Sequence, residues 1–376
     1  MEKGNGNMIP YGKQTIDEYD VKSVIGALQS DYLTTGPKVR KFEEGLAQFT
    51  GSTHAVAVSS GTAALHTAMH GIGLEKEEEV IVPAISFVAT SNCVEYLGAT
   101  PVFADIDPNT GLIDPDDIEK KITENTKAVI SMDYAGQPCD YDRISAICKQ
   151  HGLVFVSDGC HSLGAQYKEK MVGSLADLTV FSFHPVKAIT TGEGGAVLTD
   201  NPYYTEKMQS FRNHGINLDY KSRYKWHYQM ETLGHNYRIT DLQCALGLSQ
   251  LSKLRGWVYR RNDIAKVYDN AFSEASNVET LKTFDDYIHA YHLYVVKVKN
   301  REELFDKLRN QEILVNVHYL PIYLHKYYRD KYGYSEGLCP NSELFYDKIL
   351  SLPMFPSIKD EEVEDVICGV MCGAKQ

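Results

Sequence analysis

The sequence predicts an α/β protein in which a mostly parallel, mixed sheet is covered by helices on both faces. Apolar runs of strand length recur through the first two hundred residues, and amphipathic stretches of helical length separate most of them. Near-continuous apolar strands joined by helical crossovers are typical of parallel sheets that are buried on both faces. Beyond about residue 200, longer helical stretches replace this alternation, which predicts a smaller C-terminal α+β domain.

The elements of the larger domain follow in chain order. Strands are expected at the apolar runs 54–58, 79–84, 101–106, 128–132, 153–157, 178–183 and 195–199. The amphipathic stretches 86–97 and 141–150 predict helices between strands. In such sheets the ligand binds beyond the carboxyl ends of the strands, so the residues that follow these runs are candidates for a site.

The second half of the chain predicts a different arrangement. Helices are expected at 239–254, 257–275, 301–311, 341–350 and 360–372, and strands at 291–298 and 314–319. We therefore expect a large domain over residues 15–250 and a small domain over 251–376. Residues 1–14 are expected to form a lead-in, whose first seven residues have the composition of a disordered segment.

Charge and hydropathy exclude several classes of protein. The formal net charge of −12 and the lack of a basic run argue against nucleic acid as a partner, because lysine and arginine must neutralise its phosphates. No apolar stretch approaches the ~20 residues of a membrane span, so no membrane partner is expected. The N-terminus also lacks the apolar core of a signal peptide, which predicts a cytoplasmic protein.

The eight cysteines are scattered and form no Cys-x-x-Cys pair. Disulfide frameworks belong to small secreted domains, and a zinc site needs clustered ligands. Cys368 and Cys372 are four residues apart on an expected helix, where a reduced pair on one face is the simpler interpretation. We therefore predict no metal site.

An acid and a lysine lie beyond two neighbouring strands. Asp158 follows the run 153–157, and Lys187 follows the run 178–183. A pyridoxal phosphate (PLP) enzyme needs this pair, since a lysine amine holds the cofactor aldehyde as a Schiff base and a carboxylate keeps the pyridine nitrogen protonated. Separately, the two residues can also be interpreted as a surface lysine and a helix-capping aspartate. Together, beside the residues below, they favour catalysis.

The segment 59–64 is the candidate phosphate site. It follows the strand 54–58 and opens a helical run. The free N–H groups of a helix start attract an anion, Gly61 permits close approach, and the hydroxyls of Ser60 and Thr62 add donors. Taken alone, the same residues are ordinary helix-capping chemistry.

Two further residues are candidates because of their neighbours. Phe87 begins the helix expected at 86–97 and can stack on a pyridine ring, although a core aromatic is an equally natural interpretation. His161, three residues after Asp158, can hydrogen-bond the acid or the phenolic oxygen of the cofactor, although a histidine satisfied within a loop is the alternative.

Several motifs together resemble the DegT/StrS sugar aminotransferases. They are 59–64, 85–90, 133–136, 157–164, 181–197, 211–215 and 234–238, and the resemblance runs from about Ile9 to the C-terminus. The most specific is Ser-Phe-His-x-x-Lys followed by Gly-Glu-Gly-Gly. Within the family the chain is most similar to the C4 aminotransferases of pseudaminic acid biosynthesis, through 131–136, 157–161, 189–191 and 317–323. The enzymes that form UDP-4-amino-4-deoxy-L-arabinose share much of this pattern.

The resemblance implies a fold-type I PLP enzyme and a role for each matching residue. Lys187 would carry the cofactor and shuttle a proton, and Asp158 would pair with the pyridinium. The remaining cofactor contacts would come from Ser60, Gly61, Thr62, Phe87, His161 and Ser182, with Asn236 reaching the phosphate from a neighbouring subunit of a homodimer. Tyr11, Thr35, Gly36, His318 and Tyr319 would lie near the nucleotide sugar.

The resemblance also implies the reaction. L-glutamate would donate its amino group to the cofactor, which would pass it to the C4 ketone of a nucleotide-linked sugar. Two substrates that use one site in turn give ping-pong kinetics. Relatives that act as 3-dehydratases carry histidine in place of the lysine, so Lys187 argues against dehydration. A non-catalytic sugar-nucleotide-binding relative is a second alternative, and a desulfuration that uses Cys160 is a third.

Overall fold

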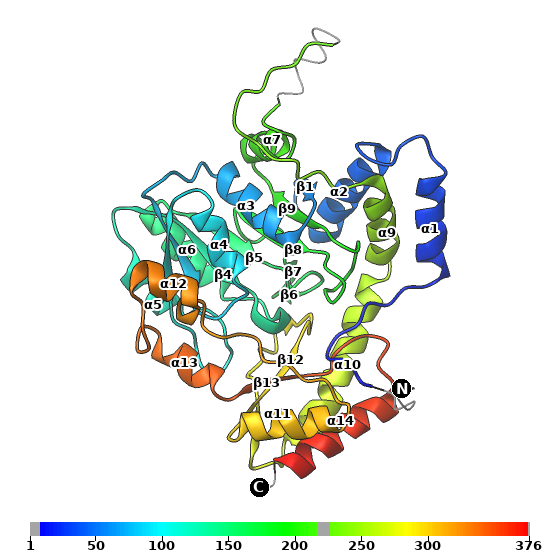
Figure 1. The fold of residues 1–376 in the computed structure, drawn as a ribbon, viewed down its shortest axis with the longest axis vertical. Coiled ribbons are helices and arrows are strands. Elements are labelled where there is room, and N and C mark those ends of the chain that lie inside the picture. The colour runs from blue at the N-terminus through cyan, green and yellow to red at the C-terminus, as the bar shows by residue number, and fades with distance from the viewer. Residues whose placement is uncertain (1–7, 217–225, 375–376) are drawn as a thin grey trace.

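A seven-stranded sheet forms the centre of the larger part of the molecule in the computed structural model, which describes residues 8–216 and 226–374 (Figure 1). The strand order is β1-β9-β8-β5-β4-β2-β3. β9 runs antiparallel to β1 and β8, and the remaining pairs are parallel. The strands are β1 (His54–Val58), β2 (Glu79–Pro83), β3 (Thr100–Ala104), β4 (Thr126–Met132), β5 (Val154–Asp158), β8 (Leu178–Ser182) and β9 (Gly195–Thr199). The predicted fold class is confirmed.

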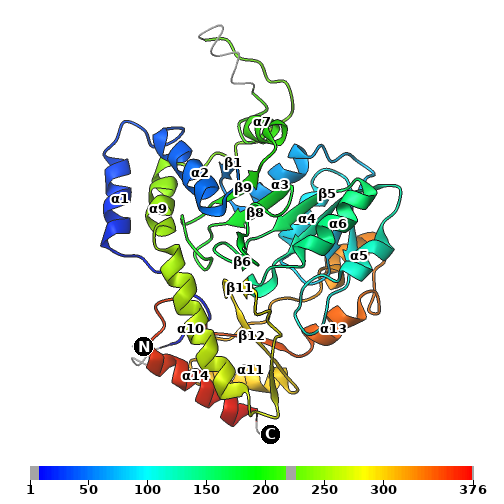
Figure 2. The same ribbon diagram turned by 180° about the vertical axis from the view of Figure 1, so that it is seen from behind.

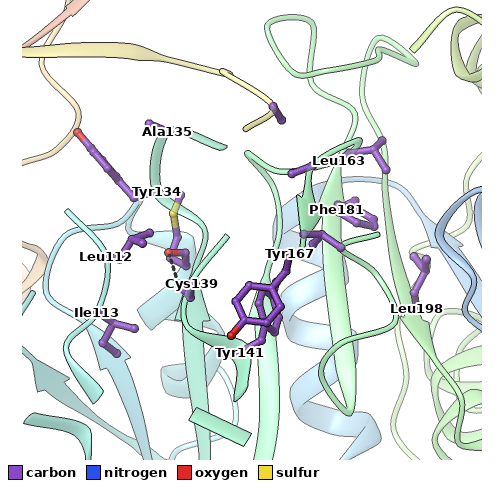
Figure 3. Close-up of a cluster of buried hydrophobic side chains, with 14 of the residues drawn as sticks. Leu112, Ile113, Tyr134, Ala135, Cys139, Tyr141, Leu163, Tyr167, Phe181 and Leu198 are labelled. Carbon is purple, nitrogen blue, oxygen red and sulfur yellow. Dashed lines mark hydrogen bonds between the residues drawn. The ribbon is translucent and has the colours of Figure 1, made fainter. Parts of the chain in front are cut away.

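Helices cover both faces of this sheet because successive side chains of each strand point to opposite faces. In β1, Ala55 and Ala57 join one buried cluster, while Val56 and Val58 join the other. Figure 3 shows part of the first cluster around Tyr141 and Phe181. The helices that complete this cluster are α2 (Pro37–Thr50), α5 (Pro115–Lys121), α6 (Tyr141–His151) and α9 (Asp241–Leu251). The second is completed by α3 (Gly61–Gly71), α4 (Ala89–Glu95), α7 (Pro202–Phe211) and α12 (Lys326–Tyr332).

The C-terminal part has its own sheet and its own core. The long helix α10 (Leu254–Phe272) follows α9 and runs from beside the large sheet into this part (Figure 2). Its sheet has the order β10-β12-β13, formed by β10 (Val278–Thr280), β12 (Tyr294–Val298) and β13 (Ile349–Leu352). Two helices, α11 (Arg301–Asn310) and α14 (Asp360–Gly373), pack against it. The shorter elements are β6 (Gln166–Tyr167), β7 (Lys170–Met171), β11 (Tyr287–Ile288), α13 (Pro340–Tyr346) and the 3-10 turns η1 (Tyr134–Gly136) and η2 (Ile322–Leu324).

Two predicted elements are wrong. The strand predicted at 314–319 does not form, since only isolated bridges at Ile313 and Asn316 pair this segment with its neighbours. The helix predicted over 341–350 ends at Tyr346, and Ile349–Leu352 forms β13 instead. There the pairing with β12 outweighs the local helical pattern. The disordered segment predicted at 1–7 lies outside the described residues.

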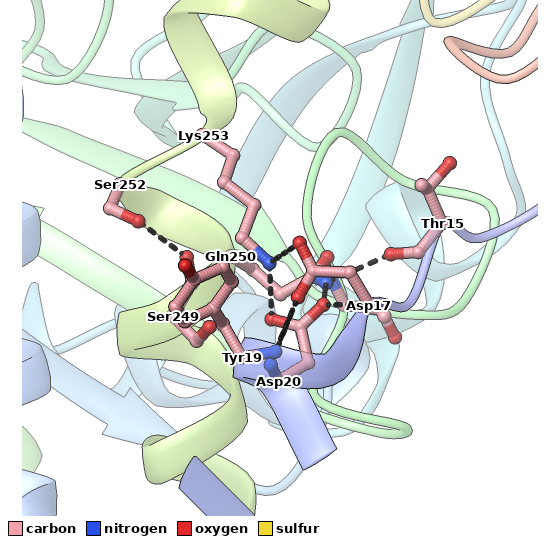
Figure 4. A network of polar contacts seen from close by, with 9 residues as sticks. Thr15, Asp17, Tyr19, Asp20, Ser249, Gln250, Ser252 and Lys253 are labelled. Carbon is pink, nitrogen blue, oxygen red and sulfur yellow. Dashed lines mark hydrogen bonds and ion pairs between the residues drawn. The ribbon is translucent and has the colours of Figure 1, made fainter. Parts of the chain in front are cut away.

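The start of the chain contacts both the C-terminal part and a helix that covers the large sheet. Ile9 exchanges backbone hydrogen bonds with the segment 312–314, and the carbonyl of Tyr11 accepts from the amide of Met354 at 3.0 Å. Further along, helix α1 (Glu18–Leu28) packs on α9. Figure 4 shows the polar contacts there, in which the amide nitrogen of Gln250 donates to the carbonyl of Thr15 at 2.9 Å and to buried Asp20 at 2.8 Å.

No helix of the described residues is long and apolar enough to cross a bilayer.

Candidate active site

Asp158 is the last residue of β5 and lies at the carboxyl edge of the large sheet. Its register partners are Met132 of β4 and Val180 of β8. The buried carboxylate accepts two hydrogen bonds, one at 2.6 Å from the hydroxyl of Thr90 and one at 3.2 Å from the amide of Cys160. These two donors fix the orientation of the carboxylate.

Lys187 lies in the loop between β8 and β9, where its backbone amide donates to the carbonyl of His184 at 2.9 Å. Its Nζ lies 3.4 Å from Nε2 of His292. Burial lowers the pKa of the Lys187 amine, because removal from water disfavours the charged form, while Cys160 and Asp158 partly oppose this effect. Burial thus favours the neutral amine at this position.

The start of α3 lies beside the end of β8. Ser60 caps the helix, since its hydroxyl accepts from the amide of Ala63 at 3.0 Å. A Cβ on Gly61 would lie 2.7 Å from Cβ of Ser182, so only glycine lets the helix start approach that strand end so closely. The helix N-terminus and the side chains of Thr62 and Ser182 therefore face one space, which suits an anion.

Three buried histidines gather above this edge. Nε2 of His161 lies 3.2 Å from the hydroxyl of Tyr319, and the rings of His161 and His292 are 4.2 Å apart. His318 pairs through Nδ1 with the hydroxyl of Ser351 at 2.8 Å. Burial and, secondarily, the charge of Lys187 lower the pKa of His318 to about 4, so this ring is neutral at pH 7.

The turn η1 holds these histidines in place. The hydroxyl of Tyr134 donates to the carbonyl of His318, and the carbonyl of Ala135 accepts from the amide of Leu293 at 3.1 Å. Gly136 has a φ of +105°, and a Cβ there would lie 2.8 Å from the carbonyl oxygen of His161. Glycine is needed at this position for its backbone conformation and for the close contact.

Asp133, which precedes the turn, is fully buried. It accepts from the hydroxyls of Ser162 at 2.6 Å and Tyr141 at 2.8 Å, and from the amide of Cys139 at 2.9 Å. Burial raises its pKa to about 6 despite these donors. Through Ser162, this carboxyl supports the loop that carries His161.

These elements enclose a cavity of about 770 Å³, which most of the predicted site residues line. They are Tyr11, Ser60, Gly61, Thr62, Phe87, Asp158, His161, Ser182, Lys187, His318 and Tyr319. Thr35, Gly36 and Asn236 do not line it. The amide of Gly36 donates to Asp241 at 2.7 Å, Thr35 is exposed, and exposed Asn236 forms a bridge with Asn213.

Sequence reasoning missed several residues of the site. Thr90 belongs to a segment that carried the family resemblance, but its contact with Asp158 depends on how α4 packs over the sheet. His292 lies just before β12 and had no sequence signal. Other cavity residues without a predicted role are Ser86, Glu193, Asn316 and His325, and Cys160, named only for the alternative desulfuration, also lines the cavity. In the part of the chain that the structure describes, no group of three acidic, histidine or cysteine side chains is arranged to hold a metal ion.

Comparisons with known proteins point to one family. The profile of the DegT/DnrJ/EryC1/StrS aminotransferase family matches residues 14–371. The spore coat polysaccharide biosynthesis protein SpsC of Bacillus subtilis (strain 168) is 39% identical over 381 residues, covering 98% of each chain. The structure of Helicobacter pylori PseC, an aminotransferase involved in the biosynthesis of pseudoaminic acid, has a TM-score of 0.94 at 35% identity and covers 98% of this chain and 100% of its own. Spr1654 from Streptococcus pneumoniae in its PLP form has a TM-score of 0.92 at 32% identity, covering 98% and 99%.

Proposed function

The chain belongs to the DegT/DnrJ/EryC1/StrS aminotransferase family, and on this premise we propose that it transfers an amino group from L-glutamate to C4 of a UDP-linked 4-keto-6-deoxy sugar. It is a PLP-dependent sugar aminotransferase. The proposed acceptor is UDP-2-acetamido-2,6-dideoxy-β-L-arabino-hex-4-ulose, and the proposed pathway is pseudaminic acid biosynthesis. The likeness to PseC supports this choice. The identity with SpsC supports a second candidate, another nucleotide-linked 4-keto sugar.

The residues around the cavity fit PLP. A lysine amine suits its aldehyde, a buried carboxylate suits its ring nitrogen, and the start of α3 beside Ser182 suits its phosphate. When bound, PLP supplies an electron sink that stabilises negative charge at the carbon attached to the amino nitrogen. The observation that best supports the proposal is that Lys187 and Asp158 line the same cavity as this helix start.

The roles that we propose follow from these contacts. Lys187 holds the cofactor covalently. When released, it moves a proton between the cofactor carbon and the sugar carbon that exchange the amino group, and its lowered pKa favours the neutral amine that this step needs. Asp158 keeps the ring nitrogen protonated, and Thr90 holds this carboxylate. Phosphate contacts come from Ser60, Gly61, Thr62 and Ser182, and ring contacts from Phe87 and His161. Tyr11, His318 and Tyr319 contact the sugar nucleotide, and Thr35 and Gly36 remain proposed contacts that one chain alone does not bring to the cavity.

We further propose a homodimer in which Asn236 reaches the partner's phosphate site. Asn236 is exposed, and the segment before it carries four exposed apolar side chains, Trp226, Tyr228, Met230 and Leu233. Burial of such side chains against a second copy would stabilise the pair. We also propose a cytoplasmic location, which the eight free cysteines support because reducing compartments keep thiols unpaired.

The test begins with enzyme converted to its pyridoxamine phosphate (PMP) form by L-glutamate. A panel of UDP- and dTDP-linked 4-keto-6-deoxy sugars is then added, and the visible band of PLP is followed. We expect the UDP-linked N-acetylated sugar to restore the band fastest, with a 4-amino sugar as product and no recovery in Lys187→Ala. A preference for a dTDP sugar would favour the second candidate. No recovery with any keto sugar would refute the proposal.

A further inference from the structure

His292 contacts the amine of Lys187 inside the cavity. Its Nε2 lies 3.4 Å from Nζ of Lys187, and its side chain is only 6% exposed. A buried ring at this distance has few ways to satisfy its polar atoms. Which of the two atoms donates the proton therefore determines which protonation state of the lysine the ring favours.

The surroundings of Nδ1, the other ring nitrogen of His292, indicate which atom donates in the contact between Nε2 and Lys187. Nδ1 is buried and has no hydrogen-bond partner among the described residues. A neutral imidazole carries its proton on one nitrogen and accepts on the other. Because an unpaired buried N–H is rarer than an unpaired acceptor, the proton belongs on Nε2. The Nε2–H then donates to Nζ of Lys187, which can accept only as a neutral amine, since an ammonium has three donors and no acceptor.

Burial favours the neutral form of both His292 and Lys187. Burial, followed by the charge of Lys187 and the rings of His161 and His318, lowers the pKa of His292, as does buried Arg261 on α10. The guanidinium of Arg261 donates to the carbonyls of Tyr291 and Met354, both at 2.9 Å. Asp158 and Cys160 face Lys187 from β5 and the loop after it, and they are the groups that favour its charged form.

The position of His292 is fixed by its backbone. The flanking residue Leu293 donates to Ala135, and Ala290 donates to the carbonyl of Gly136 at 2.9 Å. A Cβ on Gly136 would lie 3.0 Å from the amide nitrogen of His292, so the turn η1 and this segment are in close contact. The ring is therefore held against Lys187 by the same turn that supports His161 and His318.

We propose that His292 is a catalytic residue that donates an Nε2–H hydrogen bond to the free amine of Lys187 and holds it in its neutral form. This inference rests on the proposed function, in which Lys187 is released from the cofactor and must then accept a proton. The donated bond also fixes the direction of the nitrogen lone pair. His292 thus prepares the base before the proton transfer begins.

The test measures the protonation of Lys187 without turnover. Full-length enzyme is freed of cofactor, labelled with trace acetic anhydride over a range of pH, and Lys187 acetylation is quantified by mass spectrometry. Two variants form a matched pair. His292→Gln places an amide N–H near the position of Nε2, whereas His292→Asn has the same chemistry but a shorter reach. His289→Gln, a buried histidine of the same segment, is the control for local disturbance.

We expect His292→Asn to lower the neutral fraction of Lys187 about tenfold, a shift of about one pH unit upward in its titration. His292→Gln and His289→Gln should titrate like the wild type. An unchanged or lower midpoint in His292→Asn, or an equal shift in both His292 variants, would overturn the assignment.

A second measurement uses the wild-type protein and therefore does not depend on whether a variant folds. The ¹⁵N shifts of His292 in the wild-type apoenzyme should report a protonated Nε2, and a protonated Nδ1 would refute the proposal. Failure of the proposed function would look different. The Lys187 titration and the His292 shifts would then be as expected, but the enzyme would not transaminate any keto sugar.

Discussion

The hydroxyl of Thr90 lies 2.6 Å from Oδ2 of Asp158 and donates its proton to that oxygen. Ser86 lies 2.6 Å from the same hydroxyl and, because the proton of Thr90 is already committed, donates to it. A chain of two hydroxyls thus ends on the carboxylate that we assign to the cofactor ring. This arrangement holds the Asp158 carboxylate in one orientation.

Replacement of Asp158 should therefore impair catalysis more than folding. We expect Asp158→Asn to lose at least ~10²-fold in kcat at saturating PLP, because an amide cannot keep the ring nitrogen protonated. Thr90→Val should show a smaller loss in the same assay, and Thr90→Ser should restore activity, since it keeps the hydroxyl. A near-wild-type rate in PLP-saturated Asp158→Asn would contradict the role.

Lys187 should carry the cofactor. Borohydride reduction of native enzyme should fix the mass of PLP on the peptide that contains Lys187, and Lys187→Ala and Lys187→Arg should both abolish transamination, because neither can form and exchange the Schiff base. Lys168→Ala is the matched control, since Lys168 is an exposed lysine paired with Asp142. Label on Lys168 or Lys170 in the native enzyme would rule the assignment out.

Asn236 should act across a subunit interface. Mixing inactive Lys187→Ala chains with chains disabled at Asn236 should produce heterodimers in which one site carries both lesions and the other carries neither. Activity should recover toward roughly half of the wild-type rate per dimer. Suppose that heterodimers form, the Asn236 variant alone is defective, and yet no activity returns. Asn236 would then act within its own chain or not at all.

Stability should rise with pH between about 4 and 6.5. Burial lowers the pKa of His66 to about 4, of His289 to about 3 and of His318 to about 4, so the unfolded chain binds more protons than the folded one in this window. Their contribution is complete above the unfolded value near ~6.5 and is lost as the pH falls. Asp133, whose pKa is raised to about 6, has the opposite sign but is a single group.

The measurement is the Tm of the apoenzyme at several pH values. Each such histidine contributes up to about 1.4 kcal/mol per pH unit within its window. His289→Gln should flatten the dependence, whereas His151→Gln, at an exposed position that ends α6, should not. A Tm that stays constant or rises as the pH is lowered to 4.5 would contradict this account.

The sequence predicted the large sheet well because its signal is local. Each strand is an apolar run, and the family motifs follow those runs, so the fold class and the family are both confirmed. β13 could not be predicted, since Ile349–Leu352 becomes a strand only through pairing with β12. The segment after Ile313 alternates like a strand but has only single bridges to pair with.

The residues of the candidate site also fall into those that the sequence predicts and those that depend on contacts between distant segments. Lys187 and Asp158 were visible because their chemistry is tied to a motif. His292 was not, since its contact with Lys187 depends on the turn η1, more than 150 residues earlier in the chain. The roles assigned to Thr35, Gly36 and Asn236 stay predictions, because one chain does not bring these residues to the cavity.

The anchoring of the first residues has a consequence for biosynthesis. Ile9 pairs with residues 312–314, and Tyr11, which lines the cavity, is held by the amide of Met354. On the ribosome, Ile9 and Tyr11 emerge early, but their backbone partners at 312–314 and Met354 are translated only when almost the whole chain has been made. The large domain can collapse early, whereas the cavity acquires its Tyr11 wall only in the last stage of synthesis. A nascent chain interrupted before Met354 would therefore expose an unfinished pocket to chaperones and proteases.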